Sequence, residues 1–318
     1  MRMKRTIFSI FILCILSSVL AQGLLPKYGP FDQIIKHKAY TLKYNERAEQ
    51  AEWVYYVLTA EKAQGKIKRT DDFREDPFVT TGSATLADYK GSGYDRGHLC
   101  PAADNAWDRT AMSESFFMSN MSPQVPGFNR GVWKRLEEQV RQWAIENKEI
   151  HVVTAGVLTE DLPVIGPNKV AVPRFYYKVI LDYLEPELKG IAFILPNESS
   201  NKSMASYAVT IDKIEETTGI DFFHALPDDI EEKIESTMDL GLWHLGANYK
   251  NESKAATETV KNEALKTGND EIYVYITKTG KKYHTATCSY LRGSKIKITL
   301  KEAKARGYTA CSRCRPLK

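Results

Sequence analysis

The chain reads GSGYDRGH at residues 91–98, a glycine-rich segment that ends in an aspartate, an arginine and a histidine. Two more polar stretches follow, SNMSPQ at residues 119–124 and FNR at residues 128–130. Hydrolysis of a phosphodiester needs a base that deprotonates water, cations for the charge that builds on the phosphate, and a metal ion at the leaving oxygen. These stretches carry a histidine, arginines and amide oxygens, so they favour such chemistry over a purely structural role.

His98 is the candidate general base, because an imidazole has an intrinsic pKa suited to proton transfer near neutral pH. A histidine can equally be a structural residue, and this intrinsic property alone does not separate the two interpretations. Arg96 lies two positions earlier, so on an extended segment both side chains point to the same face. A base and a guanidinium would then address one phosphate, which favours the catalytic interpretation.

A helix is predicted after Gly131, because apolar residues recur at helical spacing from Trp133 to Trp143. Asn129 and Glu137 lie eight residues apart, so about two turns put them on one broad side of it. Mg²⁺ prefers oxygen ligands and keeps several waters, so Asn129 could bind it directly while Glu137 holds a coordinated water. The spacing fits equally well an Asn129 that caps the helix and an exposed Glu137.

The rest of the chain between about Lys27 and Leu245 alternates β-rich runs with helical patterns and shows no repeat. A further short helix is predicted at residues 209–218. Strands are predicted where β-branched or aromatic residues run between turn residues, at 53–58, 170–172, 175–181 and 191–195. This mixture indicates an α+β fold.

Several of these stretches together resemble the DNA/RNA non-specific endonuclease family. The resemblance covers roughly residues 40–229 and rests on DRGHL at residues 95–99, PAAD at 101–104, SNMSPQ at 119–124 and FNRGVWKRLE at 128–137. It implies the ββα-metal (His-Me finger) nuclease fold with a central antiparallel sheet. It also implies hydrolysis of DNA and RNA that depends on magnesium, with manganese able to replace it.

The resemblance further implies a role for individual residues. His98 matches the general base, Asn129 the Mg²⁺ ligand, and Glu137 the carboxylate that holds metal-bound water. Arg96 matches a phosphate-stabilising arginine, and Asn120 matches an amide that positions the site.

One arginine of the family, upstream of an Asp-Pro pair, fits two positions in this chain. Both Arg69 and Arg74 precede that pair, at spacings that differ from the family's pattern, and we favour Arg69. Cys100 stands where the family commonly has a small residue, so we interpret it as a buried small hydrophobe.

The first 21 residues predict a secretory signal peptide. Three basic residues precede an apolar run at residues 7–20, and Ala21 closes a plausible cleavage site. The mature protein would be exported, periplasmic or secreted, without stable membrane insertion. An uncleaved anchor is the alternative, but the run is shorter than the roughly 20 residues that span a bilayer.

Residues 247–270 are polar and mixed in charge, which predicts a linker between a nuclease domain at 28–246 and a small module at 271–318. So short a module needs a staple, because it cannot bury a large core. Two pairs of zinc-type ligands supply one, His284 with Cys288 and Cys311 with Cys314. We favour structural zinc over a Cys311 to Cys314 disulfide, which would leave Cys288 unpaired. The module is similar to small zinc modules appended to bacterial nucleases and, more distantly, to the zinc-binding Ada-like domain.

Charge is distributed unevenly along the chain. The formal net charge is +4, yet residues 271–318 carry twelve lysines and arginines against two acidic residues, a net of +10. Residues 22–270 carry a net of −9. The basic module is therefore a candidate surface for polyanions, and the acidic body needs a local basic cluster at any nucleic-acid site.

These observations leave three hypotheses of function. The first is an active non-specific nuclease with DNA and RNA as partners, and the second is a nucleic-acid-binding protein whose nuclease domain has lost activity. The third keeps the fold but hydrolyses a different phosphodiester. The presence of His98, Asn129 and Glu137 argues against the second hypothesis.

Overall fold

The computed structural model describes residues 23–184, 187–245, 273–278, 280–285, 288, 291, 295–311 and 314. The predicted signal peptide at 1–21 and the predicted linker at 247–270 lie outside the described residues. The chain divides into two compact units, Met1–Gly246 and Ala247–Lys318, and each is considered by itself. In the described part, no helix combines the length and the apolar character that crossing a membrane requires.

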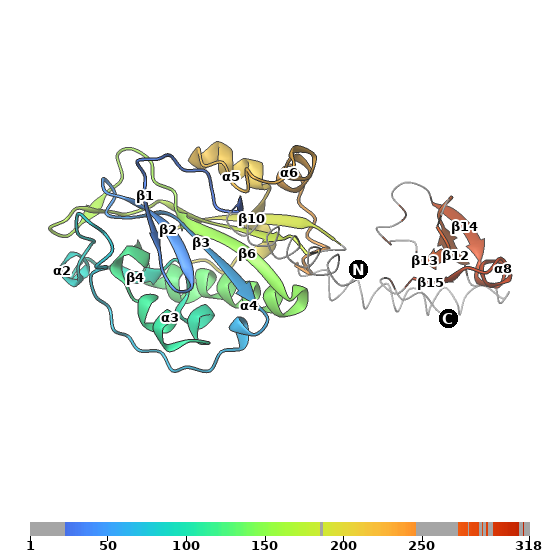
Figure 1. Cartoon of the computed structure of the whole chain (residues 1–318), viewed down its shortest axis with the longest axis horizontal. Helices are drawn as coiled ribbons and strands as arrows, with labels where there is room; N and C mark the ends of the chain where they lie inside the picture. Colours follow the sequence, from blue (N-terminus) through green and yellow to red (C-terminus); the bar gives the residue numbers. More distant parts are fainter. Residues whose placement is uncertain are drawn as a thin grey trace, which may run out of the picture. The chain divides into compact units, whose positions relative to one another are not determined.

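An antiparallel sheet of seven strands forms the centre of the first unit (Figure 1). Its strands lie in the order β1 (Gln33–Lys36), β2 (Tyr40–Asn45), β3 (Gln50–Thr59), β6 (Glu149–Gly156), β9 (Phe175–Asp182), β10 (Lys189–Pro196) and β11 (Ala208–Val209). The central strands β3, β6, β9 and β10 are buried along nearly their whole length, because both faces of the sheet are covered. Burial on both faces explains why their sequences read as continuous apolar runs.

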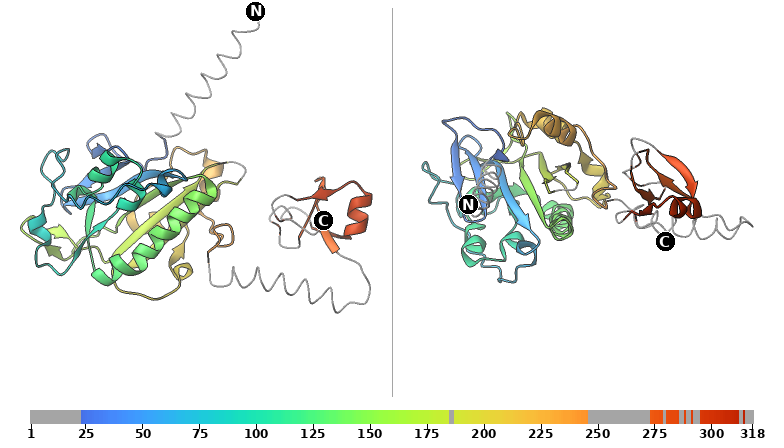
Figure 2. Two further views of the ribbon diagram at one scale, coloured as in Figure 1. Left: turned by 90° about the horizontal axis from the view of Figure 1, so that it is seen from below. Right: turned by 45° about the vertical axis from the view of Figure 1, so that its right-hand side comes forward.

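Helix α4 (Lys134–Asn147) packs on one face of this sheet, and α5 (Ile211–Thr218) and α6 (Asp228–Glu235) pack on the other (Figures 1 and 2). Strand β10 shows the division, because successive side chains on a strand alternate between faces. Phe193 stacks on Trp143 of α4, with ring centroids 5.9 Å apart. Gly190, on the opposite face, lies where a Cβ would meet Ile211 of α5 and Ile234 of α6 at 2.7 Å each.

A two-stranded ribbon precedes α4 and completes a ββα unit. Strand β4 (Asp95–His98) pairs antiparallel with β5 (Met121–Gln124), so that His98 lies opposite Met121. The side chain of Gln124 lies over Gly97, so that a Cβ there would lie 2.1 Å from it. A side chain at this position would displace the buried Gln124, which explains the glycine.

The predicted helix differs from the observed one at its start. It begins with a wide π-helical turn, η4 (Phe128–Trp133), and continues as α4 from Lys134. Gly131 lies inside the turn with non-helical torsion angles, φ −108° and ψ −108°, so the backbone kinks there. Leu136, Val140 and Trp143 are fully buried, as their spacing predicted.

Shorter elements surround this framework. They are η1 (Lys62–Gln64), α2 (Leu86–Tyr89), η2 (Ala102–Asn105), α3 (Arg109–Glu114), η3 (Met118–Asn120), η5 (Met204–Tyr207) and the paired strands β7 (Val164–Ile165) and β8 (Val170–Ala171). The strands predicted at 53–58, 175–181 and 191–195 lie within β3, β9 and β10. The helix predicted at 209–218 is α5 but begins at Ile211, because Thr210 caps it and Val209 pairs in β11.

The second unit contains a small sheet of four strands. Their order is β14 (Ile296–Thr299), β12 (Tyr273–Ile276), β13 (Lys282–His284) and β15 (Thr309–Ala310), and α8 (Leu300–Ala305) follows β14. The apolar cluster of this unit is small: Val274, Ile276, Tyr283, Ile298, Leu300 and Ala303. So little apolar surface contributes little to stability, which agrees with the need for a staple.

Candidate active site

A pocket of about 370 Å³ lies where the ββα unit meets the segment before β4. Five residues that the sequence singled out for catalysis or magnesium line it together: Arg69, Arg96, His98, Asn129 and Glu137. The other lining residues are Pro101, Ala102, Ala103, Arg130, Lys134 and Arg141. Five lining residues are thus lysine or arginine and one is acidic, so this pocket is a local basic cluster on an acidic body.

His98 ends strand β4 and is 8% exposed. Its ring packs edge-on against Phe116 and Phe73, with centroids 4.9 and 5.8 Å away. Nε2 is buried and has no hydrogen-bond partner among the described residues, so Nδ1 is the ring nitrogen able to meet a molecule in the pocket. Burial, together with the nearby charges of Arg69 and Arg96, lowers the pKa of His98 to about 3. The imidazole is therefore neutral at physiological pH and able to accept a proton.

The two phenylalanines that flank His98 also hold the two arginines. The guanidinium carbon of Arg96 lies 4.2 Å from the ring centroid of Phe73, and that of Arg69 lies 4.6 Å from that of Phe116. Planar guanidinium groups stack favourably on aromatic faces. The stacking fixes one face of each cation. Arg69 also donates from Nε to Asp71 Oδ1 over 2.5 Å, so its Nη groups are the donors left for a phosphate.

Asn129 lies in the wide turn η4, and its side chain contacts Asp95. The amide Nδ2 donates to Asp95 Oδ2 over 2.9 Å. A carboxylate only accepts hydrogen bonds, so this contact uses the nitrogen and not the oxygen of Asn129. Arg130 pairs with the same carboxylate, Nη2 to Oδ1 at 2.6 Å. The N-terminal cap of α4 is Trp133, so the alternative in which Asn129 caps this helix is wrong.

Glu137 is half-buried in the pocket wall, above a group of charged side chains that the sequence did not single out. Burial raises the pKa of Glu137, and the charges of Lys178 and Arg141 oppose this rise. Lys178 comes from β9, is fully buried, and donates to Thr154 Oγ1 over 3.2 Å. Asp104 holds Arg141, with Nη1 to Oδ1 at 2.8 Å.

These surroundings suit a hard divalent cation. Magnesium takes oxygen ligands and keeps several of its waters, and the pocket offers the amide oxygen of Asn129 and the carboxylate of Glu137. A cation would also favour the charged form of a carboxyl group whose pKa burial has raised.

Two residues from the sequence analysis do not line the pocket. Asn120 is completely buried behind His98: its amide accepts from Cys100 N at 2.9 Å and donates to Cys100 O at 2.9 Å and Ser115 O at 2.8 Å. It thus fixes the backbone that follows the histidine. Arg74 stacks on Phe117 and bonds to Asp72. Of the two candidate upstream arginines, Arg69 is the one in the pocket.

Lys178, Asp95, Asp104, Arg141 and Lys134 were missed by sequence reasoning. Asp95 and Asp104 lie inside motifs that the sequence did show, DRGH and PAAD, so they could have been found. Lys178 interrupts the apolar run of a strand predicted to be buried, and a lysine at such a position is a signal of its own.

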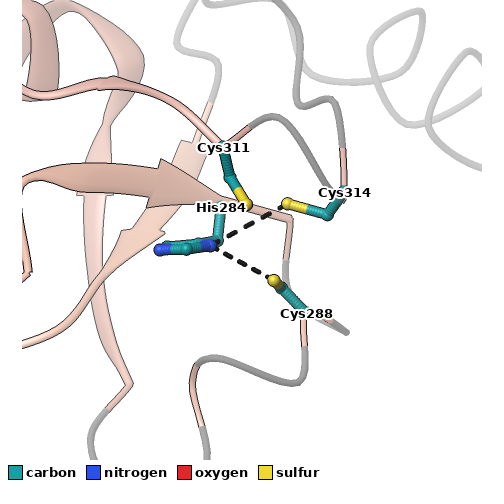
Figure 3. A group of neighbouring side chains, drawn as sticks. All are labelled: His284, Cys288, Cys311 and Cys314. Atoms are coloured by element: carbon teal, nitrogen blue, oxygen red, sulfur yellow. Dashed lines mark hydrogen bonds between the residues drawn. The ribbon is translucent and has the colours of Figure 1, made fainter. Parts of the chain in front are cut away.

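The second unit brings its four predicted zinc ligands together (Figure 3). One ligand atom from each of His284, Cys288, Cys311 and Cys314 lies within 4.8 Å of all the others. Nδ1 of His284 is 3.2 Å from Cys288 Sγ and 3.9 Å from Cys314 Sγ. Zinc bonds of about 2.0–2.1 Å to nitrogen and 2.3 Å to sulfur place ligand atoms at such separations in a tetrahedron. The donor set therefore fits zinc.

Comparison with known proteins gives a consistent result. The model of the DNA/RNA non-specific endonuclease family matches residues 27–229. Human mitochondrial endonuclease G is 36% identical over 217 residues, a match that covers 63% of this chain and 73% of that protein. A nuclease from Nostoc sp. is 34% identical over 225 residues and is matched over 81% of its length, with 67% of this chain covered.

A solved structure agrees as well. A chain in the crystal structure of an EndoG/EndoGI complex superimposes with a TM-score of 0.58 at 31% identity, covering 63% of this chain and 89% of that one. This structural similarity supports the ββα-metal nuclease fold for this chain. The matched segment contains the whole pocket, from Arg69 to Arg141. The chain therefore belongs to the DNA/RNA non-specific endonuclease family and is a hydrolytic endonuclease.

Proposed function

We propose that this endonuclease is exported, depends on magnesium or manganese, and hydrolyses DNA and RNA with little sequence preference. The observation that carries the proposal is that His98 and Asn129 line one pocket together with Arg69 and Arg96. A neutral base, an amide oxygen suited to a hard cation and two guanidinium groups are the groups that phosphodiester hydrolysis requires.

In this mechanism His98 accepts the proton of the attacking water, because its imidazole is neutral and Nδ1 is the nitrogen able to face the pocket. Arg96 and Arg69 bind the non-bridging phosphate oxygens through N–H groups that their stacking leaves available. Bound magnesium would supply charge stabilisation at the leaving oxygen, with Asn129 as its direct ligand and Glu137 holding one of its waters. Asn120 is a positioning residue that acts through the backbone of Cys100.

The low sequence preference follows from what the pocket offers. Contacts to phosphate position a nucleic acid but carry no sequence information. Five of its lining residues are cations, and such a set recognises the backbone that DNA and RNA share. A second pocket of about 350 Å³, lined by Leu86, Tyr89, Lys90, Tyr94, Asp95 and Arg96, shares Arg96 with the first and would extend the path of a strand.

The proposal also covers the two ends of the chain. Residues 1–21 would be removed on export, and residues 247–270 would link the nuclease domain at 28–246 to the module at 271–318. The module would hold structural zinc through His284, Cys288, Cys311 and Cys314. Two of its lysines contact tyrosines of β12: Lys297 Nζ lies 4.3 Å from the ring centroid of Tyr273, and Lys295 Nζ lies 5.0 Å from that of Tyr275. Basic and aromatic side chains together suit nucleic-acid binding.

One assay tests the central claim. The purified chain is incubated with plasmid DNA and with RNA, with magnesium and then with a chelator, beside the variants His98→Ala and His244→Ala. We expect cleavage of both substrates only with the metal, its loss in His98→Ala, and its retention in His244→Ala, whose histidine lies on the surface. Cleavage that survives full chelation, or a His98→Ala variant of normal activity, would refute the mechanism. N-terminal sequencing of the exported protein tests cleavage near Gln22.

A further inference from the structure

A second group of possible metal ligands lies away from the pocket, on the helices that cover the other face of the sheet. It consists of Asp212 and Glu215 of α5 and Glu235, the last residue of α6. One carboxylate oxygen from each lies within 4.8 Å of the other two. Asp212 is exposed, Glu215 is half-buried and Glu235 is buried, so the group opens to solvent at one side.

The packing of α5 and α6 on strand β10 holds these carboxylates in place. Asp212 and Glu215 are three residues apart on α5, so they project from one side of the helix. Their neighbours Ile211 and Ile234 both pack on Gly190, where no side chain could be accommodated. The two helices are therefore fixed against β10. This apolar packing brings their acidic residues together, although the carboxylates repel one another.

Glu235 is the member that needs an explanation. It is 6% exposed, and its Oε1 has no hydrogen-bond partner within the described part of the chain. A buried carboxyl group without a partner is costly. Burial, with the charges of Glu215, Glu231, Asp212 and Asp221, raises the pKa of Glu235 to about 9. Each of these neighbours is acidic, so each repels the charged form.

Two lysines near these helices pair with other acidic residues. Lys27 pairs with Asp221 at 2.8 Å, and Lys213 pairs with Glu216 at 2.6 Å. Glu215 accepts one hydrogen bond, from Phe222 N at 2.7 Å to Oε1, and a carboxylate can still coordinate through its other oxygen. Three carboxylates thus converge, and one oxygen of Glu235, Oε1, lacks a partner within the described part of the chain.

We propose that Asp212, Glu215 and Glu235 bind a calcium ion that joins α5 to α6. Calcium bonds to oxygen at about 2.3–2.6 Å, so two ligand oxygens on opposite sides of it lie roughly 4.6–5.2 Å apart. The three oxygens, each within 4.8 Å of the others, are therefore close enough to reach one shared ion. Calcium also tolerates an irregular ligand set completed by water, which the exposed side at Asp212 provides, whereas magnesium demands a near-octahedral one.

The ion would act on stability and not on the chemistry in the pocket, because it sits on α5 and α6 while the pocket is built by β4, η4 and α4. A competing explanation needs no metal: Glu235 stays protonated at neutral pH. The two explanations differ in what added calcium does.

Two measurements on the full chain test the proposal: thermal unfolding and isothermal titration. The protein is first dialysed against EGTA, and calcium chloride is the probe. We expect the wild type to bind calcium and its Tm to rise by about 5 °C or more when calcium exceeds Kd a hundredfold. Glu235→Gln should lose both responses yet unfold, without calcium at pH 8, no earlier than the wild type, because an amide, like the protonated acid, carries no charge for the neighbouring carboxylates to repel. Glu232→Gln, an exposed position on the same helix, is the matched control and should keep both responses.

Calcium could also enter the nuclease pocket, so Asn129→Ala is measured in parallel. It removes the proposed ligand there and should leave the Tm rise intact. A wild-type Tm that does not move in millimolar calcium, or a Glu235→Gln variant that responds as the wild type does, would overturn the proposal and leave a protonated Glu235.

Discussion

The side-chain amide of Asn129 donates to the carboxylate of Asp95 over 2.9 Å, across 34 positions of sequence. This bond determines which atom of the amide is left for a metal, because a carboxylate accepts only from the nitrogen. Partners of this kind orient a metal ligand and commonly affect metal affinity by 10- to 100-fold.

Replacing Asp95 with Asn should therefore weaken magnesium binding. The new amide can donate to Asn129 as well as accept from it, so the ligand oxygen is no longer held toward the pocket. We expect the magnesium concentration for half-maximal activity to rise by roughly 10- to 100-fold. Arg130→Gln is the matched control, because it removes the other partner of Asp95 and keeps the bond to Asn129. Equal magnesium requirements in Asp95→Asn and the wild type would contradict the assignment.

Loss of the base should lower turnover without lowering affinity. We expect His98→Ala to reduce kcat by roughly 10²- to 10⁴-fold with KM little changed. Asn129→Ala should differ, because it should raise the magnesium requirement as well as lower the rate. Steady-state kinetics over a magnesium series separates the two, with circular dichroism to confirm folding. An unchanged kcat in folded His98→Ala would exclude it as the base.

The ring of His98 should titrate far below the ordinary value for histidine. Burial and the charges of Arg69 and Arg96 lower its pKa from 6.5 to about 3. Only the unfolded chain takes up this proton between those values, so acidification across that window should destabilise the fold. Arg69→Gln should raise the pKa of His98 yet leave it below 6.5, because burial is the larger cause. Arg74→Gln, whose guanidinium stacks on Phe117, should not change it. NMR titration of the histidine rings measures both, and a normal pKa in the wild type would contradict the description of the site.

The second unit should hold one zinc ion. Cys311→Ser should remove it, because this thiol is buried among the other three ligands. Cys100→Ala is the matched control: Cys100 is buried in the first unit next to Asn105, and burial raises the pKa of its thiol, so it is unsuited to binding metal. Elemental analysis of the purified chain should give one zinc in the wild type and Cys100→Ala and none in Cys311→Ser. A zinc content that does not respond to Cys311→Ser would disprove the site.

Deleting residues 271–318 should weaken substrate binding mainly at low salt. The deleted module carries a net charge of +10, whereas residues 22–270 carry −9, so the remaining body repels a polyanion at long range. We expect a higher KM on long DNA at low salt and an unchanged kcat on short, saturating substrates. The difference should shrink as salt rises, because the module's contribution comes from released counterions. A deletion with no salt-dependent effect would leave the module a role in stability or docking only.

The sequence predicted those features that follow from local periodicity. Arg96 and His98 line one pocket, as two residues on the same face of a strand should. The stripe from Trp133 to Trp143 is buried against the sheet, as an apolar helical face should be. The choice between Arg69 and Arg74 depended on tertiary structure, because both stack on aromatic rings and the ring under Arg69, Phe116, packs against His98.

Features that depend on pairing between distant segments could not be predicted in this way. Lys178 is buried beneath Trp133, with its Nζ 4.7 Å from the ring centroid, because β9 lies beside β6 and α4 crosses that face. Strand order of this kind is not contained in any local pattern. The closeness of Glu215 and Glu235 also depends on tertiary packing, because it follows from the packing of α5 and α6 on Gly190.

The wide turn Phe128–Trp133 sets the rotational phase between Asn129 and Glu137. On a regular α-helix, eight residues overshoot two revolutions by roughly 80°, and the two side chains would diverge around the axis. The wide turn and its kink at Gly131 break this regular progression between the two residues, and both side chains line one pocket. Adding or removing one residue between them would rotate one against the other by about 100°. We therefore expect an insertion or deletion in this segment to separate Asn129 from Glu137, even though both side chains are retained.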